Sequence, residues 1–299
     1  MPANMPAAEH PIDASLVRAL LQAQHPDLAA LSITPVASGW DNAIFRLGDA
    51  LAVRLPRRAI AAPLVLHEQR WLPELAGRLP LPIPAPVRTG VPGCGYPWAW
   101  SVCPWIEGLG ADEAPPSPDE TARDLAAFLR ALHHAASPEA PRNPFRGGPL
   151  RDRDLALRER LVSLAERVDV ARARQAWEYA LAAPAFAGTP VWVHGDLHPA
   201  NLLVSGGRLA AVLDFGDLTA GDPATDLAAA WMLLPAEARA AFRSAYAPPD
   251  AATWRRARGW ALSHALACLA NSADNPRIAR VGVTTLARVL EDPEREGSG

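Results

Sequence analysis

Lysine is absent from this 299-residue sequence, because all 29 of its basic residues are arginine. We attribute the absence to genome composition, and it means that arginine must fill any role that lysine usually has. The basic residues are outnumbered by 32 Asp and Glu residues, which gives a formal net charge of −3. Binding along a nucleic-acid backbone depends on clustered cations. The charge balance therefore argues against a nucleic-acid partner.

Cysteine and long apolar runs are also scarce. Only Cys94, Cys103 and Cys268 occur, with no C-x-x-C spacing, which predicts reduced thiols in a cytoplasmic protein. No stretch approaches the roughly 18 apolar residues that predict a membrane helix. The first residues lack the cationic start and the apolar core of a signal peptide. We therefore expect a cytoplasmic protein without a membrane partner, and the oligomeric state is left open.

The stretch from residue 191 to residue 217 places polar side chains between short apolar runs. The runs at 191–193, 202–204 and 209–213 are typical of buried strands, and the turn at 205–207 separates the last two. The polar groups are therefore expected in loops that strand ends hold in place.

Two motifs in this stretch point to phosphoryl transfer. His194-Gly195-Asp196-Leu197 followed by Asn201 matches H-x-D-L-x-x-x-N, and Asp214 begins a D-F-G tripeptide. In this chemistry a carboxylate takes the acceptor's proton, and oxygen ligands hold Mg²⁺ on the phosphates. We predict that Asp196 is the base and that Asn201 and Asp214 are the Mg²⁺ ligands.

The segments HGDLHPANLL and DFGD closely resemble those of the aminoglycoside phosphotransferase and choline-kinase-like family, and GDPATDLA at 221–228 extends the match. The resemblance implies an α+β, two-lobed protein-kinase-like fold, with a β-rich, nucleotide-covering N-lobe at 1–104 and a helical, acceptor-binding C-lobe at 105–299. It implies ATP- or GTP-dependent phosphorylation of a small-molecule hydroxyl, with antibiotic resistance as one possible role. It also implies that Asp226 holds the backbone of the catalytic loop.

The N-terminal third is expected to bind the nucleotide. Strands predicted at 33–36, 43–47 and 51–55 form a meander, and the resemblance places Ser38, Gly39 and Asn42 of its first turn near the phosphates. Without the downstream motifs, an ordinary hairpin turn is the simpler interpretation.

Arg54 stands where kinases carry the lysine that grips the phosphates. Arginine keeps the charge and offers two parallel donors. Glu68, in a helix predicted at 64–75, is the expected ion-pair partner. The alternatives are a surface arginine and an exposed helical glutamate.

A strand predicted at 96–102 runs into the expected hinge between the lobes. There the Pro104 carbonyl and the Ile106 N–H are the predicted contacts of the purine base, in a register that could shift by one or two residues. The alternative is a plain strand that ends at Gly108.

Most other segments are predicted to be helical. A helix at 14–23 is capped by Asp13, and a capping box from Ser117 to Glu120 begins a helix that ends at His134. His133 and His134 are interpreted as residues favoured by the helix dipole. Asp222 is expected to cap a helix that reaches Leu234. Further helices are expected at 152–168, 170–183, 235–246, 251–271 and 276–290, with irregular ends at 1–11 and 291–299.

The central loop also has two rival interpretations, a transition-metal site and an inactive nucleotide-binding module. His194, Asp196 and His198 form H-x-D-x-H, which could bind a transition metal in a phosphoesterase, but no stretch supplies the further ligands of such a site. We interpret His194 as a support beneath the loop, and His198 as a supporting or phosphate-facing group. A nucleotide-binding pseudokinase that acts as an interaction module is disfavoured, because the base and both metal ligands are present.

The acceptor is predicted from the charge balance and from four tryptophans that could offer flat apolar surfaces, Trp177, Trp231, Trp254 and Trp260. Residues 105–185 hold thirteen acidic residues and eleven arginines, so no acidic excess for a polycationic substrate is visible. We therefore expect a neutral or weakly charged acceptor, such as a macrolide or a sugar-like molecule.

Overall fold

The computed structural model describes residues 6–246 and 250–292, and the chain divides into two compact units. Unit 1 comprises Met1–Glu107 and Ala211–Gly216, and unit 2 comprises Gly108–Ala210 and Asp217–Gly299. The short insertion Ala211–Gly216 carries the D-F-G motif. This motif therefore belongs to unit 1, although it follows the catalytic loop of unit 2 in the sequence.

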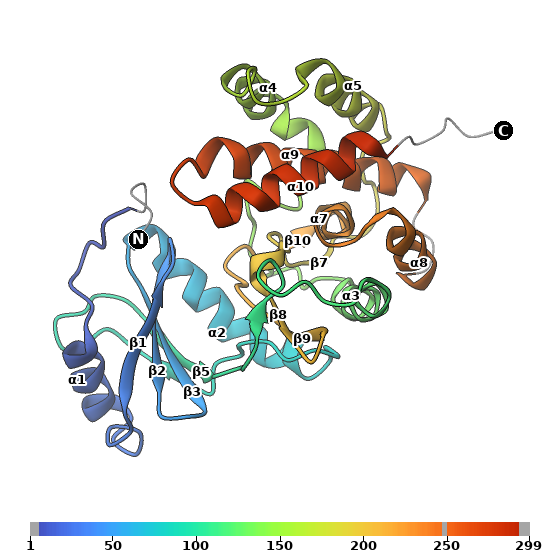
Figure 1. Ribbon diagram of the computed structural model, residues 1–299. Helices are drawn as coiled ribbons and strands as arrows, with labels where there is room; N and C mark the ends of the chain where they lie inside the picture. Colours follow the sequence, from blue (N-terminus) through green and yellow to red (C-terminus); the bar gives the residue numbers. More distant parts are fainter. Residues whose placement is uncertain (1–5, 247–249, 293–299) are drawn as a thin grey trace. The chain divides into compact units, whose positions relative to one another are not determined.

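Unit 1 is built on an antiparallel sheet with the strand order β1-β2-β3-β5-β4 (Figure 1). The predicted meander is present as β1 (Ile33–Ser38), β2 (Asn42–Leu47) and β3 (Leu51–Pro56). Its second turn contains Gly48 at a φ of 57°, which glycine adopts without strain. β5 (Trp100–Pro104) pairs with β3, and β4 (Arg88–Gly90) forms the edge.

Two helices cover opposite faces of this sheet. α1 (Ala14–Gln24) begins at the predicted cap, because the Asp13 carboxylate accepts a hydrogen bond from the Leu16 N–H. α2 (Ala62–Ala76) follows the 3₁₀ turn η1 (Ala59–Ala61). Side chains alternate along β3, so that Val53 faces α1 and its neighbour Arg54 faces α2.

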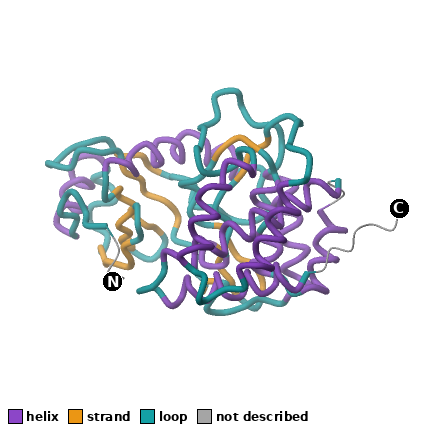
Figure 2. The backbone as a smooth tube through the Cα atoms, turned by 90° about the horizontal axis from the view of Figure 1, so that it is seen from above, coloured by secondary structure: helices purple, strands orange, loops and turns teal. Residues whose placement is uncertain are grey.

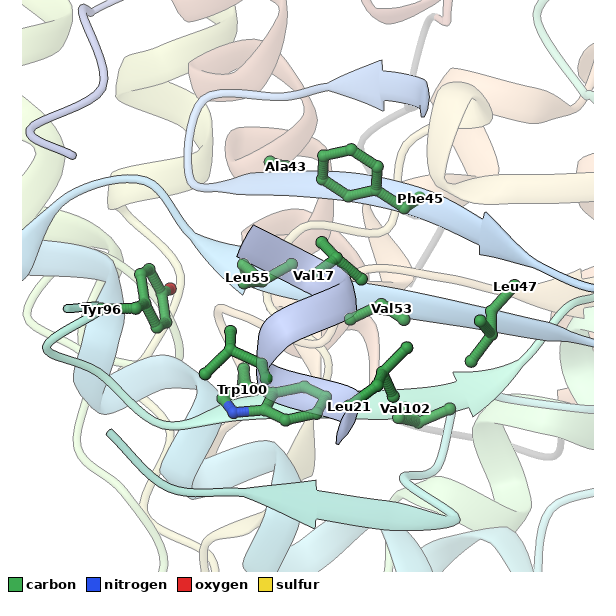
Figure 3. Close-up of a cluster of buried hydrophobic side chains, with 11 residues drawn as sticks. Val17, Leu21, Ala43, Phe45, Leu47, Val53, Leu55, Tyr96, Trp100 and Val102 are labelled. Atoms are coloured by element: carbon green, nitrogen blue, oxygen red, sulfur yellow. The ribbon is translucent and has the colours of Figure 1, made fainter. Parts of the chain in front are cut away.

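The apolar core of unit 1 lies between α1 and the sheet (Figure 3). Val17 and Leu21 of the helix pack among Phe45, Val53 and Val102 of three strands. Trp100 closes one end of this core, and a Cβ added to the glycine opposite it in β4, Gly90, would lie 1.9 Å from the indole. Only glycine allows β4 to pass so close to the ring.

Unit 2 is mainly helical (Figure 2). Its helices are α3 (Pro118–Leu132), α4 (Asp154–Ser163), α5 (Val170–Leu181), α6 (Ala224–Leu227), α7 (Ala229–Leu233), α8 (Ala236–Tyr246), α9 (Ala251–Asn271) and α10 (Pro276–Glu291), and the 3₁₀ turn η2 (Leu150–Arg153) precedes α4. α9 is buried around most of its circumference and packs against α4, α5, α6 and α10. A helix enclosed in this way is the core of its unit.

Short strands frame the catalytic loop. β7 (Val191–Val193) pairs with β10 (Thr219–Gly221), and a second small sheet has the order β6 (Leu109–Gly110), β8 (Leu202–Ser205), β9 (Arg208–Val212). The 3₁₀ turn η3 (Pro199–Asn201) connects the loop to β8. The predicted strands of this stretch are confirmed, and so is the mixed α+β class.

Several predicted boundaries are wrong for local reasons. The strand predicted from Tyr96 starts only at Trp100, since Pro97 has no N–H to donate to a ladder. Ser117 does precede α3, but its hydroxyl makes no capping bond, and the Thr121 hydroxyl instead donates to the Ser117 carbonyl. The helix expected at 152–168 ends at Ser163.

The segment after Asp222 forms two short helices, α6 and α7, in place of one. Asp222 accepts from the Ala224 N–H and also pairs with Arg256 at 2.7 Å. Residues 1–5 and 293–299 of the predicted irregular ends lie outside the described residues. Within the described ranges, no helix is both long enough and apolar enough for a membrane crossing.

Candidate active site

The catalytic loop of unit 2 is held by Asp226 of α6. The carboxylate of Asp226 is buried and accepts hydrogen bonds from the N–H groups of His194 at 2.8 Å and Gly195 at 2.9 Å. Gly195 has a φ of 89°, and a Cβ there would lie 2.6 Å from the Asp217 carbonyl oxygen. The loop thus requires glycine at this position and a carboxylate behind it, as the resemblance implied for Asp226.

A histidine and a tyrosine extend this support. His133 Nε2 donates to the Asp226 carboxylate at 3.1 Å, and His133 Nδ1 and the Tyr246 hydroxyl share a hydrogen bond of 2.6 Å. Burial raises the pKa of Asp226, but the bond and charge of His133 lower it more, so the carboxylate stays ionised. His133 is the C-cap of α3, at the helix end where it was predicted. Its side chain has a further role that the helix dipole does not cover, because it connects α3 and α8 to Asp226.

Asp196 presents a partly exposed carboxylate at the start of the loop. Its Oδ1 lies 3.2 Å from Arg146 Nη2 and 3.9 Å from His264 Nε2. Its Oδ2 lies 3.5 Å from His198 Nε2. Two groups from distant segments, Arg146 and His264, thus converge with His198 of the same loop on the predicted base.

These neighbours determine the charge state of Asp196. Burial raises its pKa, but His198, Arg146 and His264 together hold it well below the ordinary value of 3.8. The carboxylate is therefore ionised at neutral pH and available to accept a proton. His264 stays neutral, because burial and the Arg146 charge lower its pKa to about 3.

Two histidines of the loop have defined tautomers. His194 Nδ1 accepts from the Asp196 N–H at 3.2 Å, and the ring is fully buried, so His194 supports the loop from beneath as predicted. His198 Nδ1 accepts from the Ala200 N–H at 3.2 Å, which leaves the proton on Nε2, the atom that faces Asp196. Within the described ranges, no group of three His, Cys, Asp or Glu side chains is placed to hold a metal.

Asn201 is oriented by the backbone carbonyl of Asp196. Its Nδ2 donates to the Asp196 carbonyl at 2.9 Å, which leaves the amide Oδ1 as a hard oxygen donor pointing away from this bond. Mg²⁺ prefers such donors and retains several waters. The donor chemistry of Asn201 and of the Asp214 carboxylate therefore fits the predicted ion.

In unit 1, Arg54 and Glu68 form a buried ion pair at 3.0 Å, with side chains 9% and 3% exposed. The expected pairing is thus present, and the surface alternatives for both residues are wrong. Burial raises the pKa of Glu68, and Arg54 offsets only part of this rise. Burial lowers the pKa of Arg54, but the negative charge of Glu68 raises it more, with a further contribution from Asp214, so Arg54 remains charged.

Asp214 of the D-F-G motif lies near this pair, within unit 1. It has a φ of 59°, which is unusual for a residue other than glycine, and its carboxylate is exposed. Its Oδ1 accepts from the Gly216 N–H at 3.3 Å. Strained backbone of this kind is found at functional sites, where the surrounding structure compensates for it.

The predicted phosphate turn connects β1 and β2. Ser38 ends β1 and pairs with Ala43, and Gly39 donates its N–H to the Asn42 carbonyl at 2.9 Å. Arg57 donates to the Gly39 carbonyl at 2.8 Å, which ties the turn to the end of β3. The buried Asn42 Oδ1 has no hydrogen-bond partner among the described residues.

The predicted hinge follows β5. Pro104 is the last residue of that strand, and the next N–H, of Trp105, donates to the Ala50 carbonyl at 2.8 Å. The Arg46 guanidinium lies 4.8 Å from the centroid of the Trp105 ring, which fixes the segment further. Ile106, by contrast, makes no backbone hydrogen bond to any described residue, which leaves its N–H available.

Arg146, His264 and the contact of His133 with Asp226 were not predicted from the sequence. Arg146 follows Phe145 in an irregular loop and His264 lies in the middle of α9, so no local motif marks either of them. A count of histidines could have drawn attention to His264, since the chain has only eight.

Comparison with known proteins agrees with this geometry. The model of the phosphotransferase enzyme family matches residues 32–260, which is most of the chain. The chain belongs to this family. Both motifs, the Arg54–Glu68 pair and the loop held by Asp226 lie within the matched residues, and family membership makes the chain a small-molecule phosphotransferase.

Solved structures support the kinase-like fold. The GDP complex of a mutant of aminoglycoside 2'-phosphotransferase-IIIa has a TM-score of 0.68 and 20% identity, over 93% of this chain and 97% of that one. Macrolide 2'-phosphotransferase MphH from Brachybacterium faecium has a TM-score of 0.59 and 22% identity, over 95% and 100%. The ADP-bound aminoglycoside phosphotransferase APH(2'')-Ib has a TM-score of 0.59 and 18% identity, over 94% and 97%. None of the curated proteins matches the chain.

Proposed function

We propose that this enzyme transfers the γ-phosphoryl group of ATP or GTP to a hydroxyl of a small molecule. The observation that carries the proposal is the loop geometry around Asp196. Asp226 holds the N–H groups of the two preceding residues, Asn201 donates to the Asp196 carbonyl, and the Asp196 carboxylate is ionised beside Arg146. A base held in this way can act on a bound hydroxyl without reorganisation of the loop.

Phosphoryl transfer requires little covalent chemistry from the protein itself. The acceptor oxygen forms a bond to the γ-phosphorus as the bond to the β-phosphate oxygen breaks, and the acceptor's proton passes to the Asp196 carboxylate. The products are the phosphorylated acceptor and the nucleoside diphosphate. Asp196 acts in the transfer step and not in nucleotide binding, so its loss should affect the rate alone.

The remaining roles follow from the residues of each unit. Asn201 and Asp214 would hold Mg²⁺, which neutralises charge on the phosphates when it is bound. Arg54, kept in place by Glu68, binds phosphate oxygens through its planar donors. The turn of Ser38, Gly39 and Asn42 covers the phosphates, and Pro104 and Ile106 contact the base of the nucleotide.

The ligands bound in similar solved structures support the proposed phosphoryl donor and the proposed class of acceptor. GDP and ADP occur in two of the similar structures, and a further one contains kanamycin with GDP. Antibiotic resistance is therefore one role to test, beside the phosphorylation of a sugar or amino-alcohol metabolite. The cytoplasmic location stays a prediction from the cysteine content.

The test is turnover of ATP and of GTP with Mg²⁺ against a panel of hydroxyl compounds, with mass spectrometry to detect the gain of one phosphoryl group. Asp196→Asn is the control, and it should abolish most product formation while it leaves nucleotide binding intact. Absence of any phosphorylated product contradicts the proposal. Cleavage of phosphate esters without nucleotide would favour the hydrolase alternative instead.

A further inference from the structure

Arginines recur at intervals of seven residues beside the proposed base, at positions 146, 153 and 160. Arg146 bridges two carboxylates, since its Nη2 lies 3.2 Å from Asp196 and its Nε lies 3.3 Å from Asp217. Arg153, at the end of η2, donates to the Pro144 carbonyl at 3.0 Å, and its guanidinium lies 5.5 Å from the centroid of the Phe145 ring. Arg153 therefore lies against the same loop that presents Arg146.

Arg160 extends this group by two helical turns. It lies in α4, seven residues after Arg153. α4 packs against α9, and His264 of α9 lies 3.9 Å from Asp196. The Arg160 side chain is half-buried and makes no hydrogen bond to any described residue. Neither Arg153 nor Arg160 has a carboxylate within ion-pair distance in residues 6–246 and 250–292, although Asp152 and Glu159 act on them from exposed positions.

The positive charges of Arg146, Arg153 and Arg160 repel one another when no anion is bound. Burial lowers the pKa of Arg153, and the charge of Arg146 lowers it further. Burial also lowers the pKa of Arg160, followed by the charges of Arg146 and Arg153. Partly buried guanidinium groups without counterions gain free energy when an anion binds to them, and perturbed groups of this kind cluster at functional sites.

We propose that Arg146, Arg153 and Arg160 form an oxyanion subsite beside Asp196, which selects acceptors that carry a carboxylate or phosphate group near the hydroxyl to be phosphorylated. The planar guanidinium fork suits both groups. The Phe145 side chain, 60% exposed beside the subsite, offers an apolar surface for the body of the acceptor. This inference rests on the proposed function, because it concerns the acceptor of that same reaction.

The subsite changes the expected acceptor. Charge counting along the sequence led us to expect a neutral or weakly charged molecule, because acidic residues and arginines nearly balance between 105 and 185. A cationic acceptor would have to displace Arg146 from Asp196 and Asp217 and then face two further arginines. An anionic acceptor instead adds the missing counterion and leaves Arg146 in place.

The first test compares acceptors that differ only in charge. Glycerol, glycerate and glycerol 3-phosphate form one set, and galactose, galacturonate and galactosamine form another. We expect kcat/KM to be at least about 10-fold higher for an anionic member than for its neutral counterpart, the usual effect of one charge-assisted hydrogen bond. The first set shows whether carboxylate or phosphate is preferred, and the second adds a cationic member. Equal or greater efficiency with the neutral or cationic members overturns the inference.

Variants assign the effect to the subsite. Arg153→Gln and Arg160→Gln should each reduce the preference for the anionic acceptor by about 10-fold, the loss of one such contact. Arg151→Gln replaces an exposed arginine of the same η2–α4 segment and should leave the preference unchanged. An unchanged preference in both subsite variants, or an equal loss in the Arg151 control, contradicts the assignment.

A binding measurement keeps this inference separate from the proposed function. Citrate and inorganic phosphate are titrated into the nucleotide-free protein by calorimetry, with thermal unfolding to confirm that each variant is folded. Binding should weaken by about 10-fold in Arg160→Gln and stay unchanged in Arg151→Gln. Absence of anion binding by the wild-type protein, or equal binding by all three proteins, overturns the subsite. Absence of turnover with every acceptor would count against the phosphotransferase reaction alone, and the titration would still decide on the subsite.

Discussion

The buried ion pair of Arg54 and Glu68 allows a structural role to be separated from a nucleotide-binding role. Two unit charges 3.0 Å apart attract by about 5 kcal/mol at an effective dielectric constant of about 20. Removing both groups from water costs a comparable free energy. The net contribution of the pair is therefore small, but loss of one partner leaves the other charge buried without compensation.

We expect Glu68→Leu to lower the free energy of unfolding by about 3–5 kcal/mol, because Arg54 is then an unpaired buried charge. The double variant Arg54→Met/Glu68→Leu should recover most of this loss, since no charge remains to be buried. Nucleotide binding should nevertheless stay weak in the double variant, because the guanidinium that binds the phosphates is absent. Arg54→Lys should keep part of the activity, since the charge remains but the planar fork is lost.

The assay is urea unfolding of each variant, beside calorimetry with ATP and GTP in the presence of Mg²⁺. The control is the ion pair, at 3.3 Å, of Glu74 in the last turn of α2 with Arg78 just beyond the end of that helix; their side chains are 57% and 56% exposed. Glu74→Gln should change the free energy of unfolding by less than about 0.5 kcal/mol. Wild-type stability of Glu68→Leu would refute the burial argument, and wild-type nucleotide affinity of the double variant would refute the binding role.

Three further predictions concern the aspartates. Asp196→Asn should lower the rate by a factor of about 10²–10⁴ and leave nucleotide affinity unchanged, whereas Asp214→Ala should lose Mg²⁺-dependent nucleotide binding. If the two variants show the same nucleotide affinity by calorimetry and the same rate, the assigned roles are wrong. Because the folded pKa of Asp196 is depressed below 3.8, the pH profile of kcat/KM should show no acid limb from this residue between about pH 5 and 8. The pKa of Asp226 is also lower in the folded protein than in the unfolded chain. The ionised carboxylate therefore stabilises the fold at pH values above its unfolded pKa, and this stabilisation is lost as the pH falls. The difference in unfolding free energy between wild type and Asp226→Asn should accordingly shrink below about pH 4.

The part of the site that the sequence predicted is local in the chain. Asp196 and Asn201 are five residues apart, and the bond between the Asn201 amide and the Asp196 carbonyl forms within one turn of the loop. Arg54 and Glu68 lie fourteen residues apart on a strand and the following helix, where the periodicity of each element places them. Motif spacing carries this information, because few backbone conformations are compatible with it.

The contacts that the sequence did not predict join distant segments. His133 meets Asp226 across 93 residues, and Arg146 meets Asp196 across 50. Such pairs depend on how whole helices and loops pack, which no local pattern encodes. The predicted boundary at Tyr96 failed for a local reason instead, because a bridge to Gly93 replaces the expected strand ladder there.

The two arginines of α4 show why a charge count could not identify the anionic subsite. Arg158 and Arg160 are two residues apart, and at 3.6 residues per turn they point to different sides of the helix. Arg158 is exposed and paired with Asp154 at 2.9 Å, whereas Arg160 is half-buried beside Arg146 and Arg153 without a carboxylate partner in the described residues. The count gives both the same weight, although only one has its charge compensated within the protein. The free energy available for binding an anion therefore depends on which arginines lack a counterion, and this is a property of the packed helix and not of its composition.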